Sequence, residues 1–270
     1  MNPYFSIVIP TLNEELFLPK LLKDLTKQRN RNFEVIVVDS RSTDKTRDKV
    51  KDFTKVLDIS IYEAKSNVSQ GRNIGASKAK GDYLVFLDAD AQINSGFIQT
   101  LTKAVTKNKG LIFIPAIIPD KNDLQMEITF RLVNYLVEFS QNLNKPFSTG
   151  GSMIVERNFF QRIGGFDEKL FLSEDHNLIQ RAQTWGVRAK FLHSLKLKFS
   201  MRRMRREGAV KLFYQYLLAT AHVIIKGDIK EKIFNYEMGG HLYANKVIKN
   251  NDKYYLKKTL RQIKNFFNSF

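Results

Sequence analysis

Two aspartates, Asp88 and Asp90, stand two positions apart at the end of an apolar run and form the strongest local chemical signal in the chain. Alternate side chains of an extended backbone point to the same side, so the two carboxylates would face one way. Oxygen ligands of this kind suit Mg²⁺ or Mn²⁺, and such a cation neutralises a diphosphate. On this motif alone, a pair of surface aspartates in a turn stays open as the other interpretation.

A second acidic pair, Glu174 and Asp175, follows Ser173 at the predicted start of a helix. A single carboxylate that faces a bound substrate can serve as a general base. Acidic residues in a first helical turn also complement the helix dipole, which is a purely structural explanation for the same pair. The two explanations are compatible if they apply to different carboxylates.

The segments that must position these side chains alternate between strand and helix patterns in the first part of the chain. Apolar, β-branched runs typical of buried parallel strands occur at Phe5–Pro10, Phe33–Asp39, Asp58–Glu63 and Tyr83–Asp88. Helical patterns separate these runs. The alternation predicts right-handed β-α-β crossovers and an open, mostly parallel α/β sheet of Rossmann-like type, flanked by helices.

Ligands of such sheets bind beyond the carboxyl ends of the strands. Pro10, Asp39 and the segment Asp88-Ala89-Asp90 all fall at predicted strand ends. We therefore expect these residues to converge on one rim of the sheet. For Asp39, capping of the following helix is the alternative role.

The second part of the chain, from about Leu111, is less regular. Short strands are predicted at Leu111–Ile114, Ser152–Val155 and Arg188–Leu192, and helices at Leu124–Asn142, Arg157–Ile163 and Glu174–Trp185. Beyond Lys196 the pattern becomes helical and basic. The predicted organisation is one α/β domain over residues 1–200, followed by a basic, mainly helical C-terminal extension over residues 201–270.

Composition limits the class of protein. The 270 residues are 43% hydrophobic, enough for one large core, and the lack of cysteine excludes disulfides and thiolate metal sites. The sequence shows neither a secretory signal nor an apolar run of about 18 residues that could span a bilayer. These features predict a cytoplasmic protein, with peripheral association at the inner face of the membrane as an option.

The net charge of +17 is concentrated near the C-terminus, because 17 of the 44 Lys and Arg residues but only 5 of the 27 Asp and Glu residues lie from Lys196 onward. Such a segment suits an anionic partner: a lipid surface, a pyrophosphate or nucleic acid. A solvated basic face is the alternative. Leu256, Leu260, Ile263 and Phe267 share one helical face, which would lie on a membrane surface or dock on the main domain.

Several motifs in order resemble the family 2 glycosyltransferases with a GT-A fold. They are Ser6-Ile-Val-Ile-Pro-Thr-Leu-Asn-Glu-Glu15, Val37-Val-Asp-Ser-Arg-Ser-Thr-Asp44, Gly71-Arg-Asn-Ile-Gly75, Phe86-Leu-Asp-Ala-Asp90, Thr149-Gly-Gly-Ser-Met153, Gly164-Gly-Phe-Asp167 and Ser173-Glu-Asp-His-Asn-Leu178. The resemblance covers about Phe5 to Ser200. It implies a nucleotide-sugar-binding half over residues 1–110 and an acceptor and catalytic half over residues 111–200.

The resemblance also implies roles for single residues. The nucleotide-sugar site would comprise Pro10, Leu12, Glu14, Asp39, Arg72, Asp88, Ala89, Gly151, Glu174 and Arg202. In that site Asp39 would hold the base edge and Arg72 would lie near the diphosphate. Asp90 would bind Mn²⁺ or Mg²⁺ directly, and Asp175 would be the catalytic base. Arg72 as an ordinary residue of a helix surface is the alternative for that position.

Two further positions carry weaker signals. His193 follows the predicted strand Arg188–Leu192, where related enzymes often supply a third metal ligand, although a lone His is more often a packed or surface residue. The run Arg202–Arg206 would clamp a diphosphate or face anionic lipid. The chain departs from the family at Ser40 and Arg41, where a second Asp and a Gly are usual, and this leaves the nucleotide base open.

The leading hypothesis is therefore an inverting transferase of a single sugar. It would use a UDP- or GDP-linked donor, a divalent cation, and a sugar or lipid-linked acceptor. A sugar-nucleotide pyrophosphorylase would need a Gly-rich loop after the first strand, and a dehydrogenase would need G-x-G-x-x-G there, whereas the chain has Pro10–Glu15. A membrane-surface or nucleic-acid binding module would leave the strand-end carboxylates unexplained, and no nucleic-acid partner is expected.

Overall fold

The computed structural model describes residues 4–121, 123–150 and 152–208, and beyond them 215–216, 218–220, 222–223, 225, 227–231 and 239–243. The strands are β1 (Phe5–Thr11), β2 (Phe33–Asp39), β3 (Ile59–Glu63), β4 (Tyr83–Phe86), β5 (Ile112–Pro119), β6 (Met153–Glu156) and β7 (Lys190–Phe199). The helices are α1 (Leu18–Thr26), α2 (Thr46–Lys51), α3 (Val68–Lys78), α4 (Phe97–Asn108), α5 (Leu124–Ser140), α6 (Arg157–Arg162), α7 (Glu174–Thr184) and α8 (Arg202–Glu207), with a 3₁₀ turn η1 (Gly240–Tyr243).

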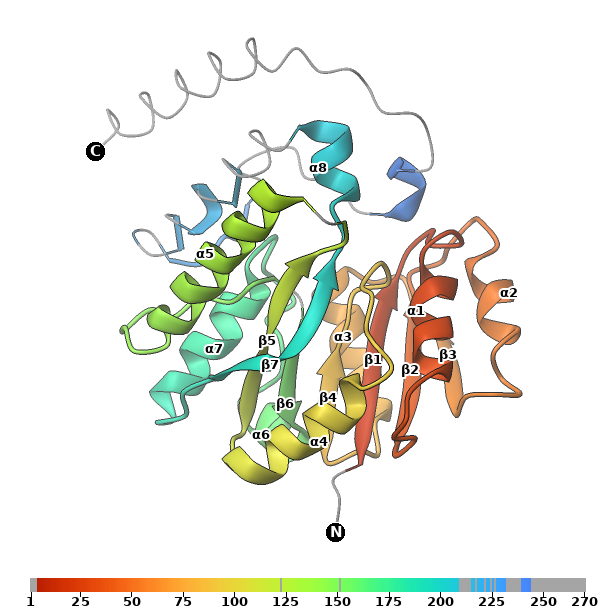
Figure 1. Cartoon of the computed structure of the whole chain (residues 1–270), viewed down its shortest axis with the longest axis horizontal. Coiled ribbons are helices and arrows are strands. Elements are labelled where there is room, and N and C mark those ends of the chain that lie inside the picture. The colour runs from red at the N-terminus through yellow and green to blue at the C-terminus, as the bar shows by residue number, and fades with distance from the viewer. Residues whose placement is uncertain are drawn as a thin grey trace.

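The seven strands form one sheet in the order β3-β2-β1-β4-β6-β5-β7 (Figure 1). Strands β3, β2, β1 and β4 run parallel to one another, and β5 and β7 also form a parallel pair. Strand β6 runs antiparallel to both β4 and β5. The predicted open and mostly parallel sheet is therefore confirmed, with β6 as its one reversed member.

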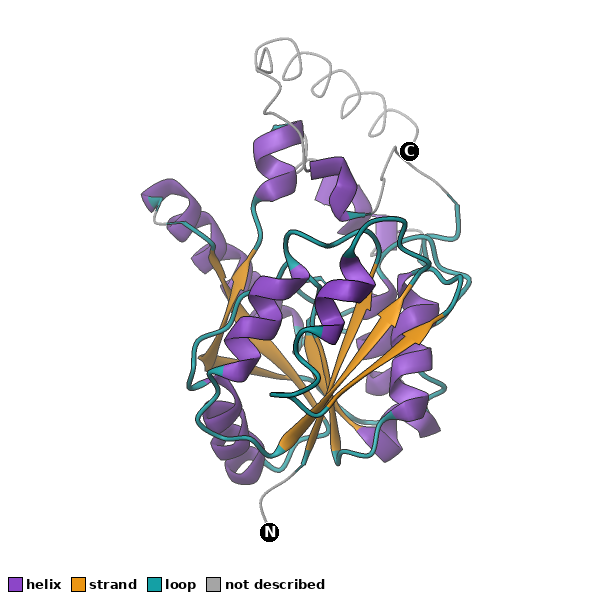
Figure 2. Ribbon diagram, turned by 90° about the vertical axis from the view of Figure 1, so that its right-hand side faces the viewer, coloured by secondary structure: helices purple, strands orange, loops and turns teal. Residues whose placement is uncertain are grey.

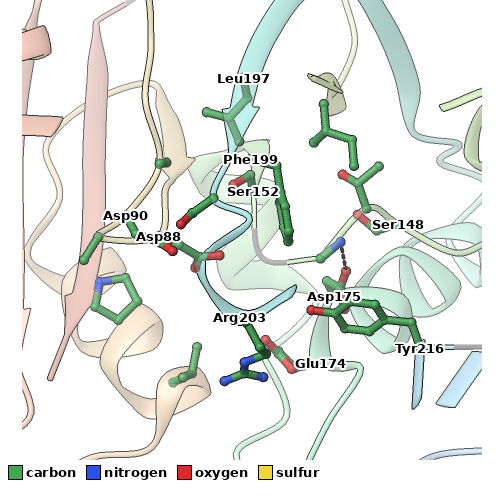
Figure 3. Close-up of a pocket in the computed structure, with 18 of the residues that line it drawn as sticks. Asp88, Asp90, Ser148, Ser152, Glu174, Asp175, Leu197, Phe199, Arg203 and Tyr216 are labelled. Carbon is green, nitrogen blue, oxygen red and sulfur yellow. Dashed lines mark hydrogen bonds between the residues drawn. The ribbon is translucent and has the colours of Figure 1, made fainter. Parts of the chain in front are cut away.

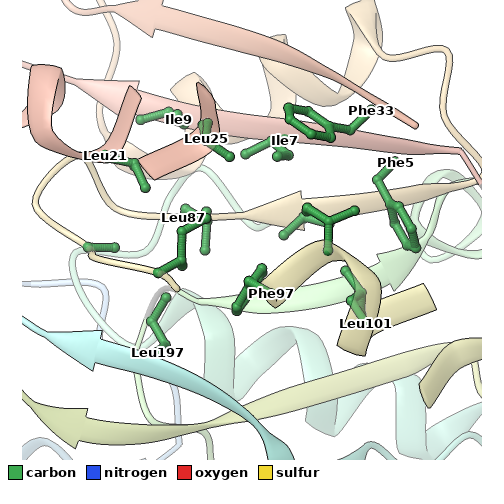
Figure 4. Close-up of a cluster of buried hydrophobic side chains, with 14 of the residues drawn as sticks. Phe5, Ile7, Ile9, Leu21, Leu25, Phe33, Leu87, Phe97, Leu101 and Leu197 are labelled. Atoms are coloured by element: carbon green, nitrogen blue, oxygen red, sulfur yellow. The ribbon is translucent and has the colours of Figure 1, made fainter. Parts of the chain in front are cut away.

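Alternation along the strands divides the core into two layers. Phe5, Ile7 and Ile9 of β1 point to the face covered by α1 and α4, where they join one buried cluster (Figure 4). The next residue of the same strand, Val8, joins a second cluster on the face covered by α3, α6 and α7. Helices therefore lie on both faces of the sheet (Figure 2), which explains why the central strands read as continuous apolar runs.

The largest departure from the sequence prediction is at the end of the domain. Strand β7 continues to Phe199 instead of ending at Leu192, and it lies at the edge of the sheet. Leu195 and Leu197 are buried, whereas Lys196 and Lys198 are exposed. This alternation is the signature of a half-buried edge strand, but the basic residues had been interpreted as the start of a helical extension. Helix α4 was not predicted at all.

Helix α3 lies unusually close to the sheet. A Cβ on Gly75 would stand 2.4 Å from a methyl carbon of Val8. The absence of a side chain at this position therefore lets α3 settle against β1, and this fixes the position of Arg72 one turn earlier.

Only fragments of the predicted C-terminal extension lie within the described residues. They include α8, which follows β7 directly, and η1. The predicted amphipathic face of Leu256, Leu260, Ile263 and Phe267 lies outside them. Across the described ranges, every helix is too short or too polar to cross a bilayer.

Candidate active site

A cavity of about 640 Å³ opens beyond the carboxyl ends of β1 and β4. Ten of the residues singled out from the sequence line it: Pro10, Leu12, Glu14, Arg72, Asp88, Ala89, Asp90, Glu174, Asp175 and Arg202. In Figure 3, Asp88 and Asp90 lie on one side of the cavity, and Asp175 and Ser148 lie opposite. Of the residues at predicted strand ends, Pro10, Asp88, Ala89 and Asp90 line the cavity, whereas Asp39 does not. Gly151 lies outside the described residues.

Arg72 connects the two sides of this cavity. Its guanidinium donates to Oδ1 of Asp88 at 2.9 Å and to Oε1 of Glu174 at 2.5 Å. The side chain is only 2% exposed, so the alternative of a helix-surface residue is wrong. Burial alone would lower the pKa of Arg72, but the charges of Asp88 and Glu174 raise it, so the guanidinium stays charged. Arg72 therefore fixes the end of β4 against the start of α7.

Asn73 makes a second connection between the same segments. Its amide donates to the backbone oxygen of Phe166 and accepts from the Phe166 N–H, both at 2.9 Å. A Cβ on Gly165, which has a φ of 65°, would stand 2.8 Å from the Asn73 side chain. The motifs beginning at Gly71 and at Gly164 are therefore two halves of one contact.

Arg202 occupies the other end of the acidic rim. It donates to both carboxylate oxygens of Glu14, at 2.6 and 2.7 Å, and its Nε lies 2.9 Å from Oδ2 of Asp90. The guanidinium also lies over the ring of Phe17, 4.6 Å from its centroid. Burial raises the pKa of both Glu14 and Asp90, and the charge of Arg202 opposes that rise. Arg202 thus supplies a positive charge where the carboxylates are most crowded.

The donor set at this rim fits a divalent cation in type. Asp88 and Asp90 offer carboxylate oxygens, the ligands that Mg²⁺ and Mn²⁺ prefer, and both line the cavity. One oxygen of each is held by a guanidinium, Asp88 by Arg72 and Asp90 by Arg202. Within the described ranges, no group of three or more His, Asp or Glu side chains gathers as a closed metal site. A cation at Asp90 would therefore compete with Arg202 for that carboxylate.

Asp175 is buried at the opposite side of the cavity. The backbone N–H of Gly150 donates to its Oδ2 at 3.0 Å, and Nδ1 of His176 lies 3.1 Å from its Oδ1. Burial alone would raise the pKa of Asp175, but the charge and hydrogen bond of His176, with Arg72 behind them, lower it to about 2. Burial opposes the charged form of His176, and Asp175 raises its pKa. Asp175 is therefore a fixed and ionised carboxylate at the cavity wall.

Asp39 lies at the rim but does not face the cavity. Its carboxylate is fully buried and accepts from the backbone N–H of Ser42 at 2.9 Å and from the Ser42 hydroxyl at 2.5 Å. The neighbouring Ser40 lines the cavity instead. Between them Arg41 has a φ of 58°, the left-handed conformation for which glycine is favoured. In this arrangement the Asp39 carboxylate stabilises the turn from Asp39 to Ser42. It does not line the cavity, where it was expected to hold the base of a nucleotide.

His193 is not brought to the cavity, which corrects the expectation of a metal ligand beside Asp90. It lies inside β7 and is 69% exposed, with Nε2 2.8 Å from Glu138 of α5. The error follows from the strand boundary, since six more residues of β7 separate His193 from the strand end at Phe199. A bulge in β7 lies between Leu192 and Lys196, and Leu192 and Phe199 pair with β5 residues four positions apart, which is roughly 13 Å at about 3.3 Å per residue. Ser200 and Arg202 take the place at the rim that His193 was expected to fill.

Several residues that line the cavity are not predicted from the sequence. The motif at the start of α7 predicts no role for His176, and Ser200 and Arg203 carry no individual signal. The start of η1 is not predicted either: the Gly240 N–H donates to the Leu12 oxygen at 3.0 Å, and a Cβ there would stand 2.3 Å from the Asn13 oxygen. Only the glycine pair Gly239-Gly240 hints at this close approach in the sequence.

Residues 6–164, more than half of the chain, match the model of the family described as Glycosyl transferase family 2. One curated relative is the GalNAc(5)-diNAcBac-PP-undecaprenol beta-1,3-glucosyltransferase of Campylobacter jejuni, 30% identical over 131 residues. That match covers 47% of this chain and 42% of the relative. A second is the poly(ribitol-phosphate) beta-N-acetylglucosaminyltransferase TarS of Staphylococcus aureus, 22% identical over 247 residues, which cover 84% of this chain and 41% of TarS. The chain thus spans less than half the length of either relative.

The fold is shared with a solved structure. The mannosyltransferase PcManGT from Pyrobaculum calidifontis, in complex with GDP-Man and Mn²⁺, superposes with a TM-score of 0.64. The match is 20% identical and covers 82% of this chain and 65% of that protein. The similarity establishes the sheet and helix arrangement common to the two proteins.

Proposed function

Because the chain belongs to glycosyl transferase family 2, we propose that it transfers one sugar, with inversion, from a nucleotide-sugar donor to an acceptor hydroxyl. The donor is UDP- or GDP-linked, and a divalent cation, Mn²⁺ or Mg²⁺, assists. The observation that carries the proposal is one cavity with an ionised carboxylate, Asp175, on one wall and the pair Asp88 and Asp90 on the other.

In this reaction Asp175 acts as the general base. It takes the proton from the acceptor hydroxyl as the oxygen attacks the anomeric carbon in line, on the side away from the leaving group. The new glycosidic bond forms while the bond from the anomeric carbon to the phosphate oxygen breaks. The proton ends on Asp175 and the electron pair leaves with the nucleoside diphosphate. The Gly150 N–H, by holding one oxygen of Asp175, orients the carboxylate for this step.

The leaving group departs with developing negative charge, which cationic groups stabilise. Arg202 and Arg203 both line the cavity, Arg202 beside Asp90 and Arg203 near Glu174 (Figure 3), and both are suited to this role. A divalent cation held by Asp90, with Asp88 beside it, would supply Lewis-acid stabilisation of the same charge. Arg72 acts indirectly, because its contacts with Asp88 and Glu174 keep the two walls of the site in register.

We propose further that the acceptor is lipid-linked. The name of the Campylobacter jejuni relative specifies an undecaprenol-linked acceptor, and one wall of the cavity in this chain is apolar, formed in part by Ile117, Leu197 and Phe199. An enzyme with such an acceptor works at a membrane surface. The excess of basic residues beyond Lys196 favours attachment to an anionic inner leaflet.

Thermal denaturation with and without ligands tests the donor site. UDP and GDP, each with Mn²⁺, should be compared, and at least one should raise the melting temperature because it binds only the folded state. Asp90→Ala should abolish this shift, whereas Asp120→Ala, which removes an acidic residue outside the cavity, should retain it. No shift with any nucleoside diphosphate or nucleotide sugar would contradict the proposal.

A further inference from the structure

Helix α5 carries an apolar face that nothing in the described chain covers. Seven of the twelve large hydrophobic side chains exposed among the described residues lie on it or in the turn that follows: Leu124, Ile128, Leu132, Tyr135, Leu136, Phe139 and Leu143. Their spacing of three or four residues places them on one side of the helix. Leu124 is 74% exposed and Tyr135 is 62% exposed. We refer to these seven residues as the α5 apolar face.

This face is continuous with the cavity of the proposed active site. Phe130, Val133 and Val137, on the inner side of α5, line the cavity. Leu136 belongs to both surfaces, because it lines the cavity and is 44% exposed. The apolar lining of the cavity therefore reaches the outer surface of α5 at Leu136.

The α5 apolar face is bordered by charges of both signs. Arg131 within the helix, Lys121 before it and Lys145 after it are all exposed. The acidic residues nearby are Asp120, Asp123, Glu127 and Glu138. Of these, Asp120 pairs with Arg205, Asp123 accepts from the Met126 N–H, and Glu138 pairs with His193 of β7. Lys196 and Lys198 of β7 lie in the groove beside α5 together with Arg131, so basic residues outnumber acidic ones by five to four. Basic residues beside an apolar stripe are a feature of helices that lie in the interface of a membrane.

Charge also decides among the occupants of this face. A second copy of the chain would bring another net charge of +17 against the first. Residues 244–270 of the same chain carry seven Lys or Arg against one Asp, a charge of +6, and residues 1–243 carry the remaining +11, so the two charges have the same sign. An anionic bilayer offers both the apolar layer and the opposite charge.

We propose that α5 is the membrane-contacting element of this protein, lying in the interface of an anionic bilayer with its apolar face toward the acyl chains. The inference rests on the proposed transfer to a lipid-linked acceptor, since the acceptor then enters the cavity from the α5 side without leaving the membrane. It differs from attachment through the basic C-terminal region, because it assigns the contact to the catalytic domain itself.

Labelling of single cysteines tests this assignment in the full chain. The protein has no cysteine, so Leu132→Cys and, as a matched control, Val56→Cys each provide one site for an environment-sensitive dye. Both side chains are exposed, at 57% and 56%, but Val56 lies far along the chain from α5. Vesicles of equimolar phosphatidylglycerol and phosphatidylcholine should shift the dye at position 132 to the blue and leave the dye at position 56 unchanged.

The same assay separates the alternatives. An emission at position 132 that is already blue-shifted without vesicles would overturn the proposal. If this emission then shifts to the red when the protein is diluted, a second copy covers the α5 apolar face. If the emission stays blue-shifted on dilution, the chain itself covers the face. Vesicle binding that leaves position 132 unchanged would also overturn the proposal and assign the contact to another region, such as the basic C-terminal segment.

Partitioning measures the strength of the contact. The double variant Ile128→Gln/Leu132→Gln should bind these vesicles at least about tenfold more weakly, because each exposed leucine or isoleucine contributes to burial in the interface. Val56→Gln should bind as the unmodified chain does. The thermal shift with UDP or GDP and Mn²⁺ should be unchanged in the double variant. If the unmodified chain shows no thermal shift with any donor nucleotide, only the proposed function is contradicted. If the double variant binds vesicles as tightly as the unmodified chain, only the α5 assignment is contradicted.

Discussion

The two parts of the described domain differ in how completely they bury their apolar side chains. In residues 4–110, the inner face of α1 is fully buried, and the carboxylates at the rim pair with Arg72 and with Arg202 from later in the chain. In residues 111–200, α5 leaves an apolar face exposed and β7 forms the sheet edge. The first part thus has its apolar helix face covered by the chain itself, whereas the second part has one that no described residue covers.

The largest effect is expected where the two parts face each other across the cavity. Asp175→Asn removes the proposed base but keeps a side chain of nearly the same size. Turnover should fall by about 10²- to 10⁴-fold, the usual contribution of a general base, while the thermal shift with donor nucleotide and metal is kept. Steady-state kinetics with a transferred radiolabelled sugar measure the loss. Near-normal turnover would remove Asp175 from the base role.

The next effect concerns the contact that joins the two parts. Arg72→Met removes a buried guanidinium and leaves Asp88 and Glu174 without their partner. Breaking a buried ion pair in this way typically costs about 3–5 kcal/mol of unfolding free energy. Lys51→Met is the matched control, because both partners of its pair with Asp48 are exposed and water screens such a pair, so little change is expected. Urea denaturation of both variants should separate them, and equal losses would contradict the role of Arg72.

A smaller effect is expected from the close approach of α3 to the sheet. Gly75→Ala adds a methyl group only 2.4 Å from a carbon of Val8, so the helix must shift. Overpacking of this kind usually costs about 1–3 kcal/mol. Gly96→Ala, whose added Cβ would have no neighbour nearer than 3.4 Å, provides the comparison. Equal melting temperatures for the two variants would show that α3 tolerates the shift.

The same contrast explains what could be predicted from the sequence. The strands of residues 4–110 were located within one or two residues, because burial on both faces gives uninterrupted apolar runs. Asp88, Asp90, Glu14 and Arg72 were placed at the rim because strand ends and motif order fix their positions locally. Asp175 was identified in the same way, from its motif at the start of α7.

The rest depended on contacts that no local pattern contains. Alternating Lys and Leu residues near the end of β7 fit an edge strand as well as a helix, so His193 was assigned to the wrong position. The turn from Asp39 to Ser42 is stabilised by the buried Asp39 carboxylate, which accepts from both the backbone N–H and the hydroxyl of Ser42. The pairing of Arg202 with Glu14 joins residues 188 positions apart, and neither residue alone predicts the other. The α5 apolar face could not be distinguished from a core face, because only the three-dimensional arrangement shows what remains uncovered.

A pH-dependent effect tests the environment of the proposed base. The pKa of His176 is raised by Asp175, so its stabilising contribution is complete below its unfolded pKa of about 6.5 and is lost as the pH rises through the folded pKa. Because an imidazolium weakens Asp175 as a base, turnover should rise several-fold, about 3- to 10-fold, over the same window. The stabilising contribution of Asp175, whose pKa is lowered to about 2, is lost only as the pH falls toward that value. His176→Gln should remove both the loss of stability and the rise in turnover above pH 6.5. An unaltered pH profile in this variant would exclude an effect of His176 on Asp175.

The smallest effect is expected at Leu132 of α5, and a matching substitution at Leu22 of α1 turns it into a direct comparison between the two parts. Leu22 of α1 is fully buried, whereas Leu132 of α5 is 57% exposed. Leu22→Ala should lower the unfolding free energy by about 2–5 kcal/mol, since it removes packed methyl groups and leaves a cavity. Leu132→Ala should change it by no more than about 0.5 kcal/mol, because in the absence of a bilayer this side chain contacts mainly water. Urea denaturation in detergent-free buffer makes the comparison, and a loss at Leu132 close to that at Leu22 would mean that the α5 apolar face is already buried within the protein.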